Sequence, residues 1–132
     1  MLSQAQPPDE SAARPPEPVR ELAIDRSILG EWLGDDEAAV DLLLAEFRDS
    51  IHAEYAIMIA ALGRGDMSEY GQAVHRLRGA ALSMGANPLA RAAAVLDIAA
   101  RAKDPHGCRE GISELETRLR EMVEHVPCPE AS

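Results

Sequence analysis

One long apolar stripe limits what this chain can fold into more than any other feature of its sequence. Between residues 40 and 62, apolar side chains recur at every third or fourth position. This spacing gathers side chains on one face of an α-helix and does not fit the alternation of a β-strand. The pattern predicts a helix that opens at Asp35 or Asp36 and ends at Gly63 or Gly65. Its stripe consists of Val40, Leu44, Phe47, Ile51, Tyr55, Met58 and Leu62.

Shorter stripes on both sides predict further helices. A short helix is expected to end at Leu33, and three longer helices are expected after the long one, the last of them running on before Pro127. Each start has a residue that can cap a helix, and in two cases proline follows it, which is typical of a first helical turn. The expected starts are Ile24 or Asp25, Asp66, Asn87 and Asp104. Long helices joined by short loops predict an all-α fold, an antiparallel four-helix bundle with a short additional N-terminal helix.

The composition fits one small domain between two tails. Only 3% of the 132 residues are aromatic, so aliphatic residues and alanines must form the core, which favours closely packed helices. Early prolines predict a disordered tail or linker over residues 1–22, then the bundle over 23–126 and a flexible tail over 127–132. The sequence has no apolar stretch that could span a bilayer and no signal peptide. A cytoplasmic protein is therefore expected. Because no second apolar stripe is left over, it is expected to be a monomer.

Charge and motif content exclude several classes of function. A net charge of −10 argues against nucleic acids and anionic membranes as partners. Cys108 and Cys128 match no metal-ligand spacing, and no zinc helix, phosphate-binding glycine loop or serine-nucleophile motif occurs. No metal and no cofactor is therefore expected. The carboxylates of the last helix alternate with arginines, as on an ordinary solvated helix face.

One histidine is predicted to stand on the exposed side of the third long helix. At about 100° per residue, His75 lies nearly opposite the apolar arc, with Gly71 and Gly79 one turn to either side. Glycine in an exposed helix costs about 1 kcal/mol relative to alanine. A side chain leans over the turn before it, so any residue larger than glycine at 79 is expected to overhang His75. The arc consists of Tyr70, Ala73, Val74, Leu77, Ala80, Ala81 and Met84.

The charges near His75 allow two interpretations. No acidic residue occurs between Glu69 and Asp97, whereas three arginines do. The gap can be a matter of chance, with arginines that merely solvate a helix beside a surface histidine. We favour a locally positive field around His75 that suits a phosphoryl group or an acidic docking pocket. The three arginines are Arg76, Arg78 and Arg91.

The sequence around His75 resembles a known phosphoacceptor motif. Residues 75–79 read His-Arg-Leu-Arg-Gly and Gly85-Ala86 follow, which is similar to the His-x-Leu-Lys-Gly pattern and later Gly-Ala pair of histidine-containing phosphotransfer (HPt) domains. The likeness extends over about residues 24–125. Arg78 stands where the family usually has lysine, and Ala80 where it often has serine. Arginine keeps the positive charge and can bind phosphate oxygens as a fork.

The resemblance implies a phosphorelay intermediate without catalytic turnover of its own. His75 would accept a phosphoryl group from a receiver-domain aspartate and pass it to another receiver, because a neutral imidazole is a competent nucleophile. Arg78 would stabilise the phosphate and Gly79 would give access. The receiver of a response regulator or hybrid kinase would supply the metal ion. The surface expected to dock it comprises Gly71, Gln72, Arg76 and Leu82, with Leu82 as the apolar anchor and Gln72 as a hydrogen-bonding group.

Two alternatives to the relay stay open at this point. The departures at Arg78 and Ala80 fit a bundle that docks a receiver or kinase without taking phosphate. The proline-rich start also fits a linker, in which case the chain would be the phosphoacceptor module of a larger hybrid or chemotaxis-type histidine kinase.

Overall fold

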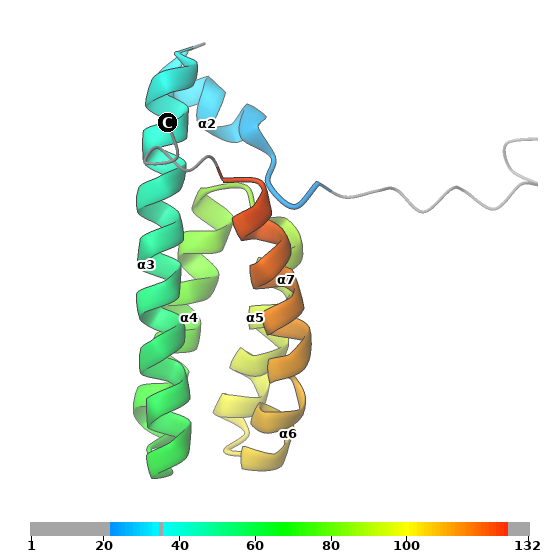
Figure 1. The fold of residues 1–132 in the computed structure, drawn as a ribbon. Coiled ribbons are helices and arrows are strands. Elements are labelled where there is room, and N and C mark those ends of the chain that lie inside the picture. Colours follow the sequence, from blue (N-terminus) through cyan, green and yellow to red (C-terminus); the bar gives the residue numbers. More distant parts are fainter. Residues whose placement is uncertain (1–21, 35, 127–132) are drawn as a thin grey trace, which may run out of the picture.

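A computed structural model describes residues 22–34 and 36–126, and within them every regular element is a helix (Figure 1). Asp35, Cys128 and nearly all of both predicted tails lie outside these residues. No helix in the described part has the length and hydropathy that crossing a bilayer requires. The predicted all-α class is confirmed. In chain order the helices are α2 (Arg26–Leu33), α3 (Glu37–Arg64), α4 (Met67–Ser83), α5 (Asn87–Arg101), α6 (Pro105–Glu110) and α7 (Ile112–Glu124).

The long helices form the expected antiparallel bundle. Helix α3 packs on α4, α4 on α5, and α5 on α6 and α7. The Tyr55 hydroxyl on α3 donates a hydrogen bond to Glu116 on α7, which joins the last helix to the first long one. Helix α2 packs on α3 and lies at the end of the bundle where α3 begins (Figure 1). The four-helix bundle with a short additional N-terminal helix is therefore confirmed.

The long apolar stripe of α3 faces the core as predicted. Five of its seven members are buried, while Phe47 and Tyr55 are partly buried and pack against the core. The predicted arc of α4 is buried too, apart from the partly buried Ala80. The apolar residues of α2 differ in burial: Leu29 is buried, whereas Trp32 is 78% exposed. Burial of aliphatic side chains, each contributing roughly 1.5–3 kcal/mol when complete, thus holds the bundle together.

The turn between α4 and α5 fixes where α2 begins. Gly85 has a φ of +76°, and its carbonyl accepts a 2.8 Å hydrogen bond from the Asp25 N–H. A Cβ atom at Gly85 would lie 2.4 Å from the Asp25 carbonyl oxygen. The Asp25 carboxylate in turn caps α2 by accepting a bond from the Ser27 N–H, and bonds from Ser27 lower the pKa of Asp25. The turn thus needs glycine for its backbone angle and for the close approach.

Two local expectations about helix ends are wrong. Asn87 is the first residue of α5 rather than its cap, which is Ala86 and makes no side-chain cap bond. The last predicted helix is divided into α6 and α7 at Gly111. A Cβ atom at Gly111 would lie 2.4 Å from Leu96 Cδ2 on α5. This glycine therefore lets the segment approach α5 closely. The expected burial of Cys108 is confirmed, and burial raises the pKa of its thiol.

Replacing Gly85 by alanine should destabilise the fold by about 2 kcal/mol, because the residue would be held in a left-handed conformation and against Asp25. Urea denaturation measures the loss. Gly63→Ala is the matched control: it lies within α3 with no atom within 4 Å of the new Cβ, and should stabilise the helix by up to about 1 kcal/mol. Equal stability of the two variants would contradict this account of the turn.

The two tyrosines should titrate late in the folded protein. Burial, and then the bond to Glu116, raises the pKa of Tyr55 to about 12 from 10.0, and burial raises that of Tyr70 as well. Since folding raises both pKa values, their contribution to stability is complete below pH 10 and is lost as the pH rises towards 12. Tyrosinate absorbance should therefore appear near pH 10 in urea but well above it in buffer. Coincident titrations would show that neither hydroxyl is held as described.

Candidate functional site

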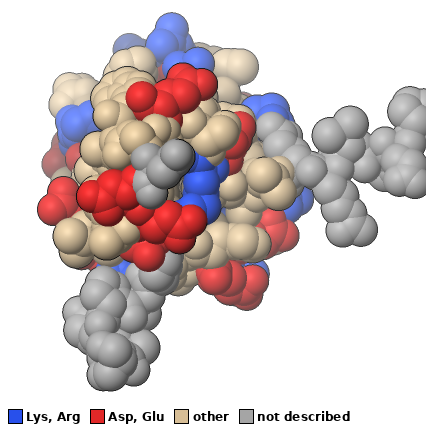
Figure 2. Space-filling model, turned by 90° about the horizontal axis from the view of Figure 1, so that it is seen from above, with Lys and Arg blue, Asp and Glu red and all other residues tan. Residues whose placement is uncertain are grey.

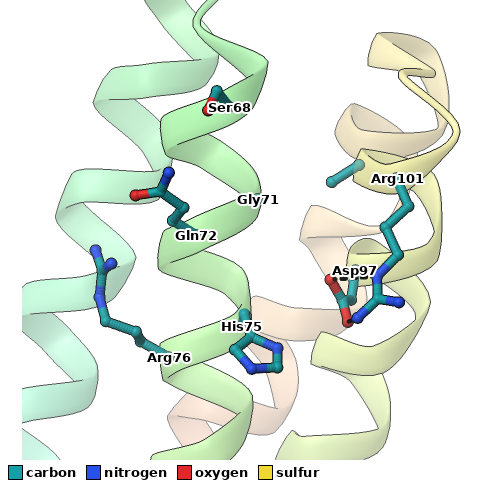
Figure 3. Close-up of a pocket in the computed structure, with 8 residues that line it drawn as sticks. Ser68, Gly71, Gln72, His75, Arg76, Asp97 and Arg101 are labelled. Carbon is teal, nitrogen blue, oxygen red and sulfur yellow. Dashed lines mark hydrogen bonds and ion pairs between the residues drawn. The ribbon is translucent and has the colours of Figure 1, made fainter.

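His75 lies halfway along α4 with its imidazole exposed, as the sequence predicts. Its neighbours Val74 and Leu77 are fully buried and hold this turn of the helix against the core. In Figure 3 the imidazole ring projects from α4 on the side that faces α5. An exposed ring on a firmly packed helix is open to a partner while its backbone stays fixed.

A cleft of about 470 Å³ lies beside this ring, between α4 and α5. A Cβ atom at Gly71 would come within 3.5 Å of the Ala100 Cβ, an ordinary contact, so small residues from both helices form the wall here. Three residues of the predicted docking surface share this cleft with His75. Its lining consists of Ser68, Gly71, Gln72, His75 and Arg76 from α4, and Asp97, Ala100 and Arg101 from α5 (Figure 3).

Arg78 and Leu82 do not line this cleft. They line a neighbouring groove of about 230 Å³, which also lies between α4 and α5, together with Asn87, Ala90, Arg91 and Ala94. Leu82 is 47% exposed, as an apolar anchor requires. No side chain within residues 22–34 and 36–126 pairs with the Arg78 guanidinium. The predicted site residues are thus spread over two hollows along one α4–α5 seam, and His75 lines the first of them.

The gap in acidic residues along the sequence around His75 does not persist in the folded structure. The Arg76 Nε lies 3.0 Å from both carboxylate oxygens of Glu54 on α3, and this hydrogen bonding raises the pKa of Arg76. Asp97 on α5 lines the cleft itself. Helix packing brings both carboxylates to a segment that has none in its own sequence. Much of the predicted positive field is therefore neutralised on the Arg76 side, whereas the charge of Arg78, which has no partner in the described part of the chain, lies on the other.

The predicted role of Gly79 needs a correction. A Cβ atom at this exposed position would meet no atom within 4 Å. An alanine there would therefore leave His75 uncovered, contrary to the expectation for any residue larger than glycine. Only a longer side chain, leaning over the preceding turn, reaches the imidazole.

The residues that α5 contributes carry no signal in the sequence. Asp97 is 8% exposed, and its carboxylate lies 3.2 Å from Arg101 Nη2. Neither residue belongs to the motif around His75. Only the packing of α5 against α4 places them in the same cleft, so a sequence pattern that is read along one helix cannot find them.

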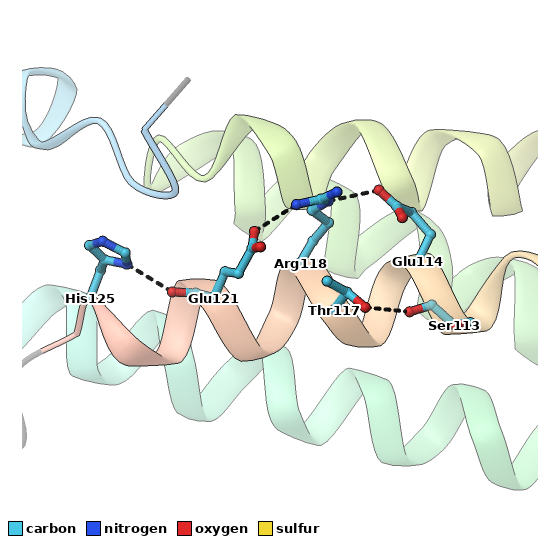
Figure 4. A network of polar contacts seen from close by, with 6 residues as sticks. All are labelled: Ser113, Glu114, Thr117, Arg118, Glu121 and His125. Atoms are coloured by element: carbon cyan, nitrogen blue, oxygen red, sulfur yellow. Dashed lines mark hydrogen bonds and ion pairs between the residues drawn. The ribbon is translucent and has the colours of Figure 1, made fainter. Parts of the chain in front are cut away.

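A further polar cluster lies on the surface of α7. Arg118 on α7 donates to both Glu114 and Glu121 over 2.7 Å, and the His125 ring contacts the Glu121 carbonyl over 2.8 Å (Figure 4). These pairs lie three or four residues apart on one helix. No group of three or more potential metal ligands occurs in the described part of the chain.

The end of the bundle where α2 lies carries several exposed acidic side chains. Viewed from above, the end where α2 lies shows large acidic areas and fewer basic ones (Figure 2). The exposed carboxylates near this end belong to Glu31, Asp36, Glu37 and Glu124.

Comparison with known proteins gives one match. The sequence model of the Hpt domain matches residues 42–126, a span that includes α4 with His75 and all of α5. No curated protein and no solved structure matches the chain.

Side-chain length at position 79 should control access to His75. Gly79→Leu should slow carbethoxylation of His75 by diethyl pyrocarbonate several-fold, whereas Gly79→Ala should not, because its Cβ meets open space. Peptide mass spectrometry measures the rate at each histidine. The exposed His106 on α6 serves as internal control. Equal rates at His75 in all three proteins would refute this description of its surroundings.

Proposed function

The chain belongs to the Hpt domain family, which carries out histidine phosphotransfer in two-component phosphorelays and interacts with receiver domains, and we propose that His75 is its phosphoacceptor. The observation that carries this proposal is the exposed imidazole that lines the cleft between α4 and α5, within the span that matches the family. His52, His106 and His125 are also exposed but line neither hollow.

The proposed step is a direct phosphoryl transfer between side chains. A ring nitrogen of neutral His75 attacks the phosphorus of a receiver's aspartyl phosphate with its lone pair. The N–P bond forms, the P–O bond to the aspartate breaks, and the carboxylate leaves with the electron pair. The proton on the other ring nitrogen passes to solvent, because the ring is exposed. The reverse sequence on a second receiver discharges the phosphohistidine.

Arg78 and Leu82 have distinct parts in this proposal. Arg78 lies one turn beyond His75, and its guanidinium can donate two parallel hydrogen bonds to phosphoryl oxygens. No side chain in the described part of the chain pairs with this guanidinium. Arg78 can therefore bind the phosphoryl group without first breaking an ion pair in that part. Leu82 offers apolar surface on the same seam. Gly79 leaves the approach open, so a receiver can bring its aspartate to the ring.

The small residues and the polar side chain of the other hollow would complete the docking surface. Gly71 keeps the cleft wall low, and Gln72 is exposed and can donate to a phosphoryl oxygen or a partner carbonyl. Arg76 is held by Glu54 and would contact the partner rather than the phosphate. We place this exchange in the cytoplasm, with the chain as a monomer and the metal ion on the receiver.

Incubation with a panel of phosphorylated receivers should label the protein with an acid-labile, base-stable phosphate. His75→Gln should abolish the label with unchanged helical content, because the amide nitrogen of glutamine, unlike an imidazole nitrogen, is not a nucleophile. His52→Gln, an exposed histidine on α3, is the matched control and should be labelled like the wild type. A label that survives His75→Gln would sink the assignment. A receiver that binds tightly without transferring phosphate would favour the docking-only bundle.

A further inference from the structure

The cleft beside His75 holds a charged pair that the proposed transfer does not use. Asp97 and Arg101 lie one turn apart on α5, and both line the cleft that His75 lines from α4. In Figure 3 the two side chains project towards α4, on the side where the imidazole stands. An arginine that lines the same cleft as a phosphoacceptor is in position to bind the phosphoryl group.

We propose that Arg101 is a second phosphate-binding residue, which donates hydrogen bonds from α5 to the phosphoryl group on His75 while Asp97 holds it over the cleft. This inference rests on the proposed phosphotransfer function. It adds a residue from outside the motif and from a different helix.

The two cations of the cleft differ in how firmly they are held. Both carboxylate oxygens of Glu54 lie 3.0 Å from a single nitrogen of Arg76. Arg101 reaches Asp97 over longer distances, 3.2 Å from Nη2 and 3.4 Å from Nε, and its side chain is 71% exposed. A longer pair with a solvated arginine loses less on rearrangement than a shorter one. Arg101 is therefore the cation that can turn to a new anion.

Asp97 determines where Arg101 can go. Its carboxylate is 11% exposed and anchored in the wall of the cleft, so it stays in place while the longer arginine moves. A guanidinium has five N–H donors, which allows Arg101 to keep a bond to Asp97 and donate others to phosphoryl oxygens. Without such a bridge, the buried carboxylate and the phosphoryl dianion would repel each other across the cleft.

Arg78 and Arg101 would then hold the phosphoryl group from two sides. Arg78 lines the neighbouring groove further along α4, whereas Arg101 lies across the cleft on α5. Removing either arginine should leave the other in place. The two contributions can therefore be separated by single substitutions.

The test uses the full chain labelled with phosphoramidate, a small donor that brings no receiver contacts. The imidazole nitrogen attacks its phosphorus, the P–N bond breaks and ammonia leaves. Phosphorus NMR then follows the ionisation of the phosphoryl group with pH. Arg101→Ala should raise the midpoint by about 0.5 to 1 pH unit, because loss of a nearby cation favours the protonated form. Arg101→Lys, which keeps the charge but not the fork, should fall between.

Arg120→Ala is the matched control, since it removes an exposed arginine from α7 and should leave the midpoint unchanged. Thermal unfolding of all variants shows whether a structural change is responsible. A midpoint for Arg101→Ala equal to that of the wild type, with His75 labelled, would overturn the role of Arg101 and leave the phosphotransfer proposal intact. A wild-type chain that takes no label at His75 from phosphoramidate or receivers would overturn both.

Discussion

The close packing of α4 against α5 is the constraint on which the site depends. Alanines are buried on both helices, among them Ala73 and Ala81 on α4 and Ala93 on α5. Small side chains let the helix axes approach, and Gly71 continues this contact to the surface opposite Ala100. Because α4 and α5 pack closely in the core, the exposed residues at the surface of this seam form shallow hollows rather than a deep pocket. His75 stands over this seam, supported by a rigid helix.

Much of the fold follows from periodicity, whereas the surroundings of the histidine do not. The stripe of α3 and the arc of α4 are sufficient to predict the bundle and the exposure of His75, because helical spacing fixes which side chains share a face. The close approach of Gly111 to Leu96 on α5 is a contact that no local pattern contains. Likewise Glu54 and Asp97 reach the site from other helices. A gap in acidic residues along one helix therefore says little about the charges around it in space.

The charges that packing brings together suggest how a small exposed site could hold a dianion without a deep pocket. One arginine is fixed by Glu54, one is weakly paired with Asp97, and Arg78 has no described partner. Arg76 is therefore held in place, whereas Arg78 and Arg101 can turn towards phosphate. An open site of this kind fits a protein that gives up its phosphoryl group as readily as it takes it, since the partner supplies the rest of the stabilisation.

The central claim is that phosphate resides on one nitrogen-bearing side chain in the middle of α4. The most direct measurement is peptide mapping by mass spectrometry, under alkaline conditions, after the chain has been mixed with a phosphorylated receiver. The account predicts a phosphorylated peptide whose modified residue is His75, appearing as the receiver loses its aspartyl phosphate. Phosphate on any other residue, or loss from the receiver with none gained at His75, would contradict it.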